Sequence, residues 1–355
     1  MAAMVIVNTP GDWSNVYWPL LHAPWHGWTP TDLIFPFFVF IVGVSIVLSS
    51  RRTATVMVIV RRAAIIFALG LLLALYPRFD VATVRIMGVL QRLAICYLAA
   101  ALIYRPLAKR VPRVRMVWTL TVATAVVALY WAIVMFVPVP GGSAGDLSPS
   151  GNLGAWIDRT VIGEAHLWRQ SRTWDPEGLL STFPAIATAL TGVAAGIVLT
   201  TGPSTAWRAM VLGVAGLVLV ILGNVWSWSF PINKNLWTSS YVVFTSGLAS
   251  IVLAAVHLAI DNRPRPPRWT YPLVVLGMNA LALFVVSGLL VKTLTLVRLT
   301  RADGQQTSLY GGIYRSVFAP LAPPKVASLL FALAALALLY SLLELMYRRR
   351  WFLKA

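Results

Sequence analysis

The stretch LIFPFFVFIVGVSIVLSS, residues 33–50, holds eighteen residues and no charged side chain. As a helix it would be roughly 27 Å long, close to the ~30 Å hydrocarbon core of a bilayer. Hydrocarbon offers the backbone no hydrogen-bond partners, so a helix, which satisfies its own backbone groups, is favoured over an open sheet. The stretch therefore predicts a transmembrane helix in an integral membrane protein.

Similar apolar runs recur along the rest of the chain. Of its 355 residues, 59% are hydrophobic and 11% are charged, whereas soluble domains carry about 25% charged residues. We predict an all-α, polytopic membrane helix bundle of about ten transmembrane helices, built as a single domain over residues 1–355. The run at 1–7 is too short to cross a bilayer and is expected to be a truncated first helix. Full spans are expected at about 33–50, 63–77, 86–104, 116–137, 179–200, 208–226, 236–260, 271–291 and 326–347.

The sign of the charge alternates from loop to loop along this predicted bundle. The positive-inside rule assigns the basic loops and the C-terminus to the cytoplasm. Residues 8–32 and 138–178 are then expected outside, the latter as an extracytoplasmic lid or a partly helical surface segment. The basic set is Arg51, Arg52, Arg61, Arg62, Arg105, Lys109, Arg110, Arg113, Arg115, Arg208, Arg263, Arg265, Arg268, Arg348, Arg349, Arg350 and Lys354. The opposite loops hold Asp12, Asp80, Asp146, Asp158, Glu164, Asp175, Glu177 and Asp303.

The net charge of +18 is explained by this topology and by contact with anionic lipid headgroups. It does not indicate a nucleic-acid partner, and membrane lipids are the partners that it favours. The single cysteine, Cys96, lies within a predicted span and excludes an internal disulfide.

The loop between the first two apolar runs carries the residues best suited to chemistry. Asn8 ends the first run, His22 lies in the loop, and Asp32 opens the next span. A carboxylate beside an imidazole can fix its tautomer and leave the other ring nitrogen free as a base or nucleophile. His22 and His26 have the i, i+4 spacing of a helical metal site, but Pro24 between them disfavours a helix, so no metal is expected.

Arg92 lies well inside a predicted span, with Gln91 beside it. A charge at that depth costs about 2.5–3.5 kcal/mol on insertion scales, so it needs a partner or a polar cavity. One interpretation is structural, a pair with Asp32 or with a carbonyl at a helix end. The other is functional, a clamp for phosphate or carboxylate, which the planar guanidinium binds in bidentate fashion.

Two further polar segments each precede a predicted helix. Asp175 and Glu177 suit a helix start, where a carboxylate caps and favours the dipole, or they bind a polar substrate at the outer mouth. Asn233, Lys234 and Asn235 lie before the next helix, whose free N–H groups favour an anion or a sugar. Anchoring of this segment at the membrane interface by its aromatic neighbours is the alternative.

Taken in order, these segments resemble a known family, the membrane-bound acyltransferases typified by heparan-alpha-glucosaminide N-acetyltransferase, with their bacterial relatives. The resemblance runs almost end to end. It departs from the family at two points. The family usually carries an Asp/Arg-Gly signature before the segment of Asn8, and this sequence starts after that point. The long luminal domain of the lysosomal member is also missing. The matching stretches are Val5–Asn8, Leu21–Gly27, Thr29–Gly43, Gly88–Arg92, Asp175–Gly178 and Pro231–Trp237.

The resemblance implies an enzyme, an acyl-CoA-dependent acyltransferase that moves acetyl from cytosolic acetyl-CoA to an amino sugar or related saccharide across the membrane. It implies a bacterial inner-membrane location, with acetyl-CoA as cosubstrate and no metal. The family's active-site histidine falls on His22 and its companion asparagine on Asn8, while Asp32 would orient or charge-stabilise His22. The candidate cofactor-binding residues are Arg92, Gln91, Lys234 and Asn235, and the candidate substrate-binding residues are Asp12, Trp25, Asp175, Glu177 and Asn233.

Several alternatives stay open at the level of sequence. Transfer could be direct, with His22 as the base for the acceptor amine, or could pass through an acetyl-histidine. Direct transfer is preferred because one histidine near both substrates suffices. A transporter or exporter of a polar or lipid-linked saccharide is the alternative function, and a catalytically inactive scaffold is a third. The identity of the acceptor and the presence of a homodimer are left open.

Overall fold

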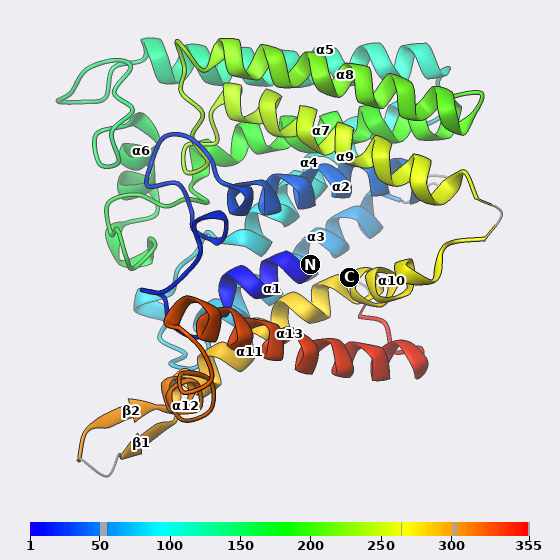
Figure 1. The fold of residues 1–355 in the computed structure, drawn as a ribbon. Helices are drawn as coiled ribbons and strands as arrows, with labels where there is room; N and C mark the ends of the chain where they lie inside the picture. The colour runs from blue at the N-terminus through cyan, green and yellow to red at the C-terminus, as the bar shows by residue number, and fades with distance from the viewer. Residues whose placement is uncertain (50–54, 264, 301–303, 354–355) are drawn as a thin grey trace.

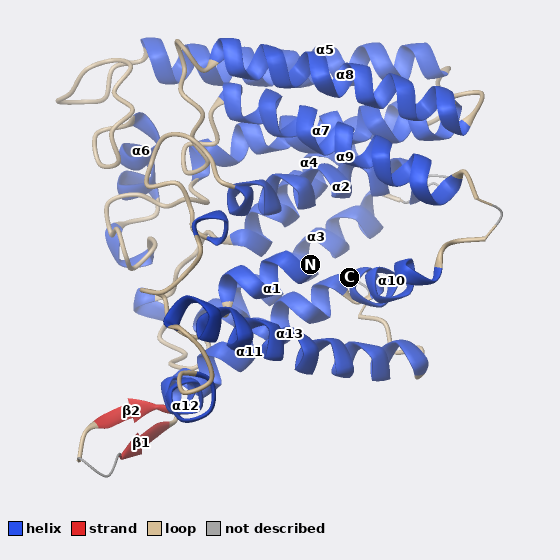
Figure 2. Cartoon of the chain, viewed as in Figure 1, coloured by secondary structure: helices blue, strands red, loops and turns tan. Residues whose placement is uncertain are grey.

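The computed structural model describes residues 1–49, 55–263, 265–300 and 304–353. Four charged residues used above for the topology, Arg51, Arg52, Asp303 and Lys354, lie outside these ranges. The chain folds as a bundle of roughly parallel helices with one small hairpin (Figures 1 and 2). The all-α class predicted from the sequence is therefore confirmed, and seven helices in the described ranges are long and apolar enough to cross a membrane.

The elements are mostly helices, joined by turns and by two longer segments at 9–33 and 137–178. The helices that fall within the predicted spans are α2 (Ile34–Ser49), α3 (Val56–Leu75), α4 (Val89–Tyr104), α5 (Pro112–Phe136), α7 (Leu179–Thr201), α8 (Thr205–Trp226), α9 (Ser239–Asp261), α10 (Tyr271–Met278), α11 (Ala280–Leu296) and α13 (Pro324–Arg348). The remaining elements are α1 (Ala2–Asn8), α6 (Leu153–Val161), α12 (Leu309–Ile313), the antiparallel strands β1 (Arg298–Thr300) and β2 (Gln306–Ser308), 3₁₀ turns at Trp18–Leu20, Pro30–Leu33, Val81–Thr83, Arg105–Leu107, Glu164–His166 and Arg268–Thr270, and a π turn at Tyr314–Phe318.

The count of spans is lower than the sequence predicted. In the described ranges there are seven candidate membrane helices, or eight if the α10–α11 pair is one span, against about ten predicted. Helix α4 has 16 residues and α1 has 7, so both fall short of a full crossing. Helix α3 begins at Val56 because the Thr55 side chain caps it, so Arg61 and Arg62 lie in its first turns and not in a loop.

The span predicted at 271–291 is broken in two. Helices α10 and α11 meet at Asn279 with a bend of 70°. The Asn279 side chain donates to the carbonyl of Trp351 at 3.1 Å and accepts from the amide of Leu353 at 3.2 Å. These bonds hold the buried Asn279 side chain against backbone outside its own helix. A side chain held in this way offers the local backbone an alternative to continuous helix, which accounts for the break.

Helix α7 forms the centre of the bundle, and α2 packs directly on it. A methyl group built on Gly43 would lie 1.9 Å from the carbonyl oxygen of Ala189, and one on Gly192 would lie 1.9 Å from that of Phe40. The two backbones are therefore in contact, with no room for side chains between them. This contact fixes the start of α2 beside the start of α7.

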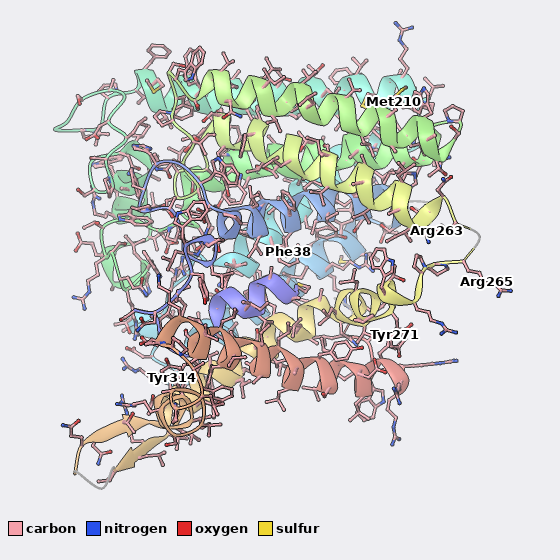
Figure 3. All side chains as sticks on the ribbon, viewed as in Figure 1. Phe38, Met210, Arg263, Arg265, Tyr271 and Tyr314 are labelled. Carbon is pink, nitrogen blue, oxygen red and sulfur yellow. The ribbon has the colours of Figure 1, made fainter. Side chains whose placement is uncertain are left out.

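The two kinds of loop gather at opposite ends of the bundle. The loops before α2, between α5 and α7 and before α9 lie at the left in Figure 1, and the turns α7–α8 and α9–α10 lie at the right. Figure 3 labels Arg263 and Arg265 at that right-hand end. The sequence predicted that the acid-bearing loops and the basic loops lie on opposite sides, and the two groups do occupy separate ends of the bundle. The loop 138–178 is partly helical through α6, as one of its two interpretations predicted.

Candidate functional site

Asp32 is held rigidly at the entrance to α2. Its Oδ2 atom accepts hydrogen bonds from the amides of Thr29 and Ala23, both at 3.0 Å, and from the Thr29 hydroxyl at 3.1 Å. Thr29 and Asp32 form a capping box, the reciprocal arrangement that ends a loop and starts a helix. Tyr241 donates to the Asp32 carbonyl at 2.5 Å. With Oδ2 engaged, the carboxylate presents Oδ1 to one partner.

That partner is His22, whose Nδ1 lies 2.6 Å from Asp32 Oδ1. The Asp32 side chain is 2% exposed, whereas that of His22 is 53% exposed. The carboxylate therefore fixes the imidazole tautomer with the proton on Nδ1, and Nε2 is left as the acceptor. The pairing of His22 with Asp32 that the sequence suggested is formed.

Lys234 completes this cluster from a distant part of the chain. Its Nζ atom lies 3.5 Å from Asp32 Oδ1 and 3.1 Å from His22 Nδ1. Burial lowers the pKa of Lys234 below its ordinary value, and the charge of Asp32 opposes that shift only in part. We call His22, Asp32 and Lys234 the imidazole cluster.

The segment before α9 positions Lys234. Asn233 is fully buried, its side-chain oxygen accepts from the amide of Leu236 at 2.9 Å, and its amide nitrogen lies 3.3 Å from His26 Nδ1. Trp237 is fully buried with φ of 52°, a left-handed conformation that costs of order 1–3 kcal/mol. Strain of this kind persists only where surrounding packing imposes it, so the turn that carries Lys234 is rigid.

A second polar cluster lies at the start of α7. Arg85 Nε donates to Asp175 Oδ2 at 2.8 Å, and its Nη2 donates to Asp175 Oδ1 and Glu177 Oε2 at 2.5 Å each. Burial alone would raise the pKa of Glu177, but the charges of Arg85 and Arg92 bring it below its usual value. We call Arg85, Asp175 and Glu177 the carboxylate cluster.

Arg92 is fully buried beside this cluster. Its Nη2 donates to Ser181 Oγ and to the Gly178 carbonyl at 3.4 Å, and its Nε donates to Thr182 Oγ1 at 3.2 Å. The guanidinium also lies 4.9 Å from the ring centroid of Trp237, a cation–π distance. Of the two structural partners left open by the sequence, the helix-end carbonyl is correct and Asp32 is not. Nη1 is buried without a hydrogen-bond partner among the described residues.

The carboxylates before α7 do not cap the helix as the sequence suggested. Asp158 in α6 does so, because its Oδ1 accepts from the amide of Leu179 at 2.8 Å. Burial raises the pKa of Asp158 to about 6. Asp175 instead accepts from the amide of Glu177 at 2.9 Å and uses its remaining capacity on Arg85.

The other predicted residues are spread around these clusters. Asn8 is exposed at the end of α1, which contacts the turn that carries Asp32. Asp12 accepts from the amide of Ser14 and from the side-chain amide of Asn15 in its own turn.

The remaining predicted residues lie between loops or line cavities. Trp25 donates to the Leu147 carbonyl at 2.8 Å and packs edge-on against Trp174, so it connects two outer loops. Gln91 lines a large pocket, and Asn235 lines a small cavity together with Asp158 and Asp175.

The sequence did not predict Arg85 as a residue of the site, nor Asp158 as the cap of α7. The available signal for Arg85 was its position, since the outer loop 78–85 holds two arginines and one carboxylate, which runs against the charge trend of the outer loops. Within the described ranges, no three His, Cys, Asp or Glu side chains are grouped so as to hold a metal ion. That the reaction uses no metal stays a prediction.

The fold and these clusters define a polytopic helical membrane protein with an imidazole–carboxylate pair in the loops at one end of its bundle. Residues 1–149 match the family model described as heparan-alpha-glucosaminide N-acetyltransferase, catalytic. Over these residues the chain is similar to this family of membrane proteins.

Two relatives carry the name heparan-alpha-glucosaminide N-acetyltransferase. The Mus musculus protein is 31% identical over 343 residues, which cover 80% of this chain and 51% of the mouse protein. The Homo sapiens protein is 29% identical over 340 residues, which cover 79% of this chain and 50% of the human protein. The chain thus spans about half the length of these relatives.

Proposed function

We propose that the chain is a membrane acetyltransferase that moves acetyl from acetyl-CoA to the amine of an amino sugar. Similarity to the family supports the reaction class. One observation carries the proposal: His22 Nδ1 lies 2.6 Å from Asp32 Oδ1 while the His22 side chain is 53% exposed. An imidazole that is oriented by a buried carboxylate, on a half-exposed side chain, has the geometry of a general base.

The proposed reaction is direct transfer. The acceptor reacts as the neutral amine, because a protonated amine has no lone pair. Nε2 of His22 takes a proton from this nitrogen as the nitrogen attacks the thioester carbonyl. The new C–N bond forms, the C–S bond breaks, and the imidazolium returns the proton to the departing thiolate. The products are the N-acetylated sugar and CoA, and the base is regenerated.

Lys234 takes a different role in this proposal from the cofactor contact that the sequence suggested. Its ammonium group lies 3.1 Å from His22 Nδ1, beside the proposed base. Once the tetrahedral intermediate forms, a cation this close favours negative charge on the oxyanion. Asn8, on the helix that contacts the Asp32 turn, is the proposed second donor to that oxyanion.

The remaining assignments follow from position. The carboxylate cluster and Asn233 lie at the same loop end as His22 and are proposed to face the acceptor amine and hydroxyls, with Asp12 and Trp25 around them. Arg92, Gln91 and Asn235 are proposed to contact the donor. The basic loops are proposed to face the cytoplasm of a bacterial inner membrane, with the C-terminus inside and the His22 loop outside.

A thiol-release assay with purified protein, acetyl-CoA and glucosamine tests the function. Wild type should release CoA and form the acetylated sugar in equal amounts, and His22→Ala should lose at least about a hundredfold in rate, the lower end of general-base contributions. His166→Ala, a histidine outside the imidazole cluster, is the matched control. A protein that binds or moves the sugar without releasing CoA would instead be a transporter.

A further inference from the structure

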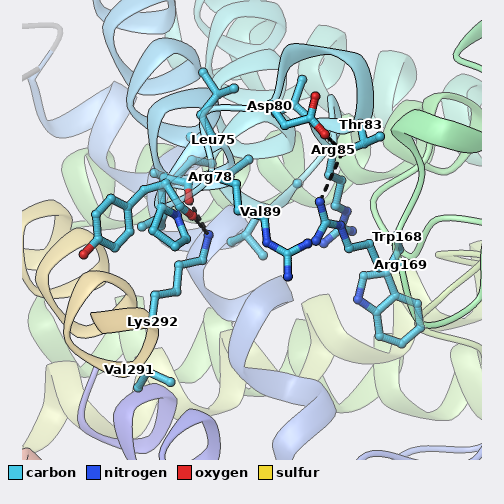
Figure 4. A pocket seen from close by; sticks show the side chains of 18 of the residues that line it. Leu75, Arg78, Asp80, Thr83, Arg85, Val89, Trp168, Arg169, Val291 and Lys292 are labelled. Carbon is cyan, nitrogen blue, oxygen red and sulfur yellow. Dashed lines mark hydrogen bonds between the residues drawn. The ribbon is translucent and has the colours of Figure 1, made fainter. Parts of the chain in front are cut away.

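A pocket of about 640 Å³ lies apart from the imidazole cluster and shares only Arg85 with the carboxylate cluster. Its volume falls within the range of about 300–1,000 Å³ found for small-molecule sites. Its walls come from α3, α4, α11, the loop that joins α3 to α4 and residues 168–170. Figure 4 shows the pocket from close by, with Lys292 reaching from α11 to the backbone at the end of α3.

The cations around the pocket outnumber the acids that neutralise them. Lys292 Nζ donates to the carbonyl oxygens of Leu73 and Tyr76, at the end of α3. Asp80, the one carboxylate in the lining, accepts from the Ala82 amide and the Thr83 hydroxyl of its own turn. The remaining basic residues of the lining are Arg78, Arg85, Arg169 and Arg298.

Three of these arginines form no salt bridge. Arg85 is balanced by the carboxylate cluster, whereas Arg169 donates to the Thr83 hydroxyl at 3.3 Å, and its charge acts on Asp80 from beyond salt-bridge distance. Among the residues that the structure describes, Arg78, Arg169 and Arg298 make no salt bridge, and all three are exposed. Their guanidinium groups give the lining an excess of positive charge, which favours an anion.

Another part of the same lining is apolar. It includes Leu73, Met87, Leu90, Phe284 and Val291, of which Met87 and Leu90 are buried. A free small anion would leave these walls unused. A molecule with a charged head and a hydrocarbon chain satisfies both halves, because its phosphate can be held in bidentate fashion by arginine while its chain is removed from water.

We propose that this pocket binds a phosphate-bearing amphiphile, with the phosphate between Arg78, Arg169 and Arg298 and the chain against α3 and α11. The lipid can be a phospholipid of the surrounding bilayer or a polyprenyl phosphate, since both present the same phosphate and hydrocarbon. The site stands apart from the imidazole cluster and does not depend on acetyl transfer.

The test measures lipid binding by delipidated protein in neutral detergent, from the rise in melting temperature and from native mass spectrometry. The probes are phosphatidylglycerol, a polyprenyl phosphate, phosphatidylcholine, inorganic phosphate and acetyl-CoA. One or both of the first two should bind in a one-to-one complex, and the tighter of them identifies the source of the phosphate. The tighter of the two should bind at least about tenfold more tightly than phosphatidylcholine, because arginines near a headgroup each favour negative charge.

Two variants and one control separate charge from shape. Replacing Arg78, Arg169 and Arg298 together by Gln should weaken binding at least about tenfold. Val291→Trp, which fills the apolar part of the pocket, should weaken it while leaving the charges in place. The control replaces Arg113, Arg265 and Arg349, exposed and in or next to the basic loops, by Gln and should bind as wild type does.

Several outcomes would overturn the proposal. Equal binding of phosphatidylcholine would show that the arginines do not select the headgroup. Equal binding of inorganic phosphate, or unaltered affinity in Val291→Trp, would show that the chain plays no part. Displacement of bound lipid by acetyl-CoA that is lost in the triple Gln variant would assign the pocket to the cofactor instead.

Discussion

The ammonium nitrogen of Lys234 lies 3.1 Å from Nδ1 of His22, a residue 212 positions earlier in the chain. The two meet because α9, which follows Lys234, packs in the same core as α2, which follows His22. Asp32 lies within 4 Å of both and ties the imidazole and the ammonium to one carboxylate. The predictions below test what each member of this arrangement and its surroundings contributes.

Asp32→Asn should leave the shape of the site intact but remove its charge. The amide can offer Nδ2–H to His22 Nδ1, which would place the imidazole proton on Nε2 and abolish base function there. We expect a fall in kcat of about 10²–10⁴ with a small change in KM. Rates for Thr31→Ala, a buried neighbour that bonds to the Pro19 carbonyl, provide the control. Unchanged kcat in Asp32→Asn would refute the orienting role.

Lys234→Met should lower kcat, because it removes the cation that lies 3.1 Å from His22 Nδ1 and is proposed to favour negative charge on the oxyanion. Lys234→Arg keeps a cation at this position and should retain more of the wild-type kcat. Steady-state rates with acetyl-CoA and glucosamine measure both variants. A kcat of Lys234→Met equal to that of wild type would contradict the proposed role.

Arg85→Met should destabilise the protein because it leaves Asp175 and Glu177 buried without their partner. Breaking a buried ion pair by removing one member costs about 3–5 kcal/mol, and the 24% exposure of Arg85 places the expected loss toward the lower end. Thermal unfolding in detergent measures it. The exposed Arg113, changed to Met, should shift the melting temperature little. If replacing Asp175 and Glu177 by Asn and Gln in Arg85→Met restored nothing, the explanation would fail.

Asp158 should make stability depend on pH. Its pKa is raised from 3.8 to about 6, so between about pH 4 and pH 6 the folded protein keeps a proton that the unfolded chain has lost. The free energy of unfolding should therefore fall as the pH rises through this window, by about 3 kcal/mol in total, and stay level above it.

Asp158→Asn checks this assignment, since the amide oxygen can still accept from Leu179. The variant should lose the slope between pH 4 and pH 6 and be the more stable protein at pH 7, as measured by thermal unfolding across pH. Glu164→Gln, in the same outer loop but exposed, should keep the wild-type slope. A slope that survives in Asp158→Asn belongs to another group.

Much of the fold was predictable because hydrophobic length is a strong signal. Each of the nine predicted full spans contains a helix, and the separation of acid-bearing and basic loops followed from charge alone. The break at Asn279 was not predictable, since it depends on the backbone at Trp351 and Leu353 folding back onto that amide. Local hydropathy contains no information about such a distant contact.

The candidate site was likewise predictable only in part. The pair His22 and Asp32 could be proposed because the two residues flank one short loop. The approach of Lys234 to that pair, and of Arg85 to Asp175 and Glu177, requires the tertiary arrangement of helices that are far apart in sequence. The pair of Arg92 with Asp32 was wrong for the same reason, because α7 supplies nearer oxygen atoms.

The backbone contact between α2 and α7 has a consequence for how such a protein can diversify. Asp32 opens α2, the carboxylate cluster precedes α7, and the two helices touch at Gly43 and Gly192 without intervening side chains. The separation between the two polar groups is therefore set by main chain deep in the bundle. The loops at that end of the bundle can lengthen, shorten or change sequence, while the distance from Asp32 to the carboxylate cluster stays the same.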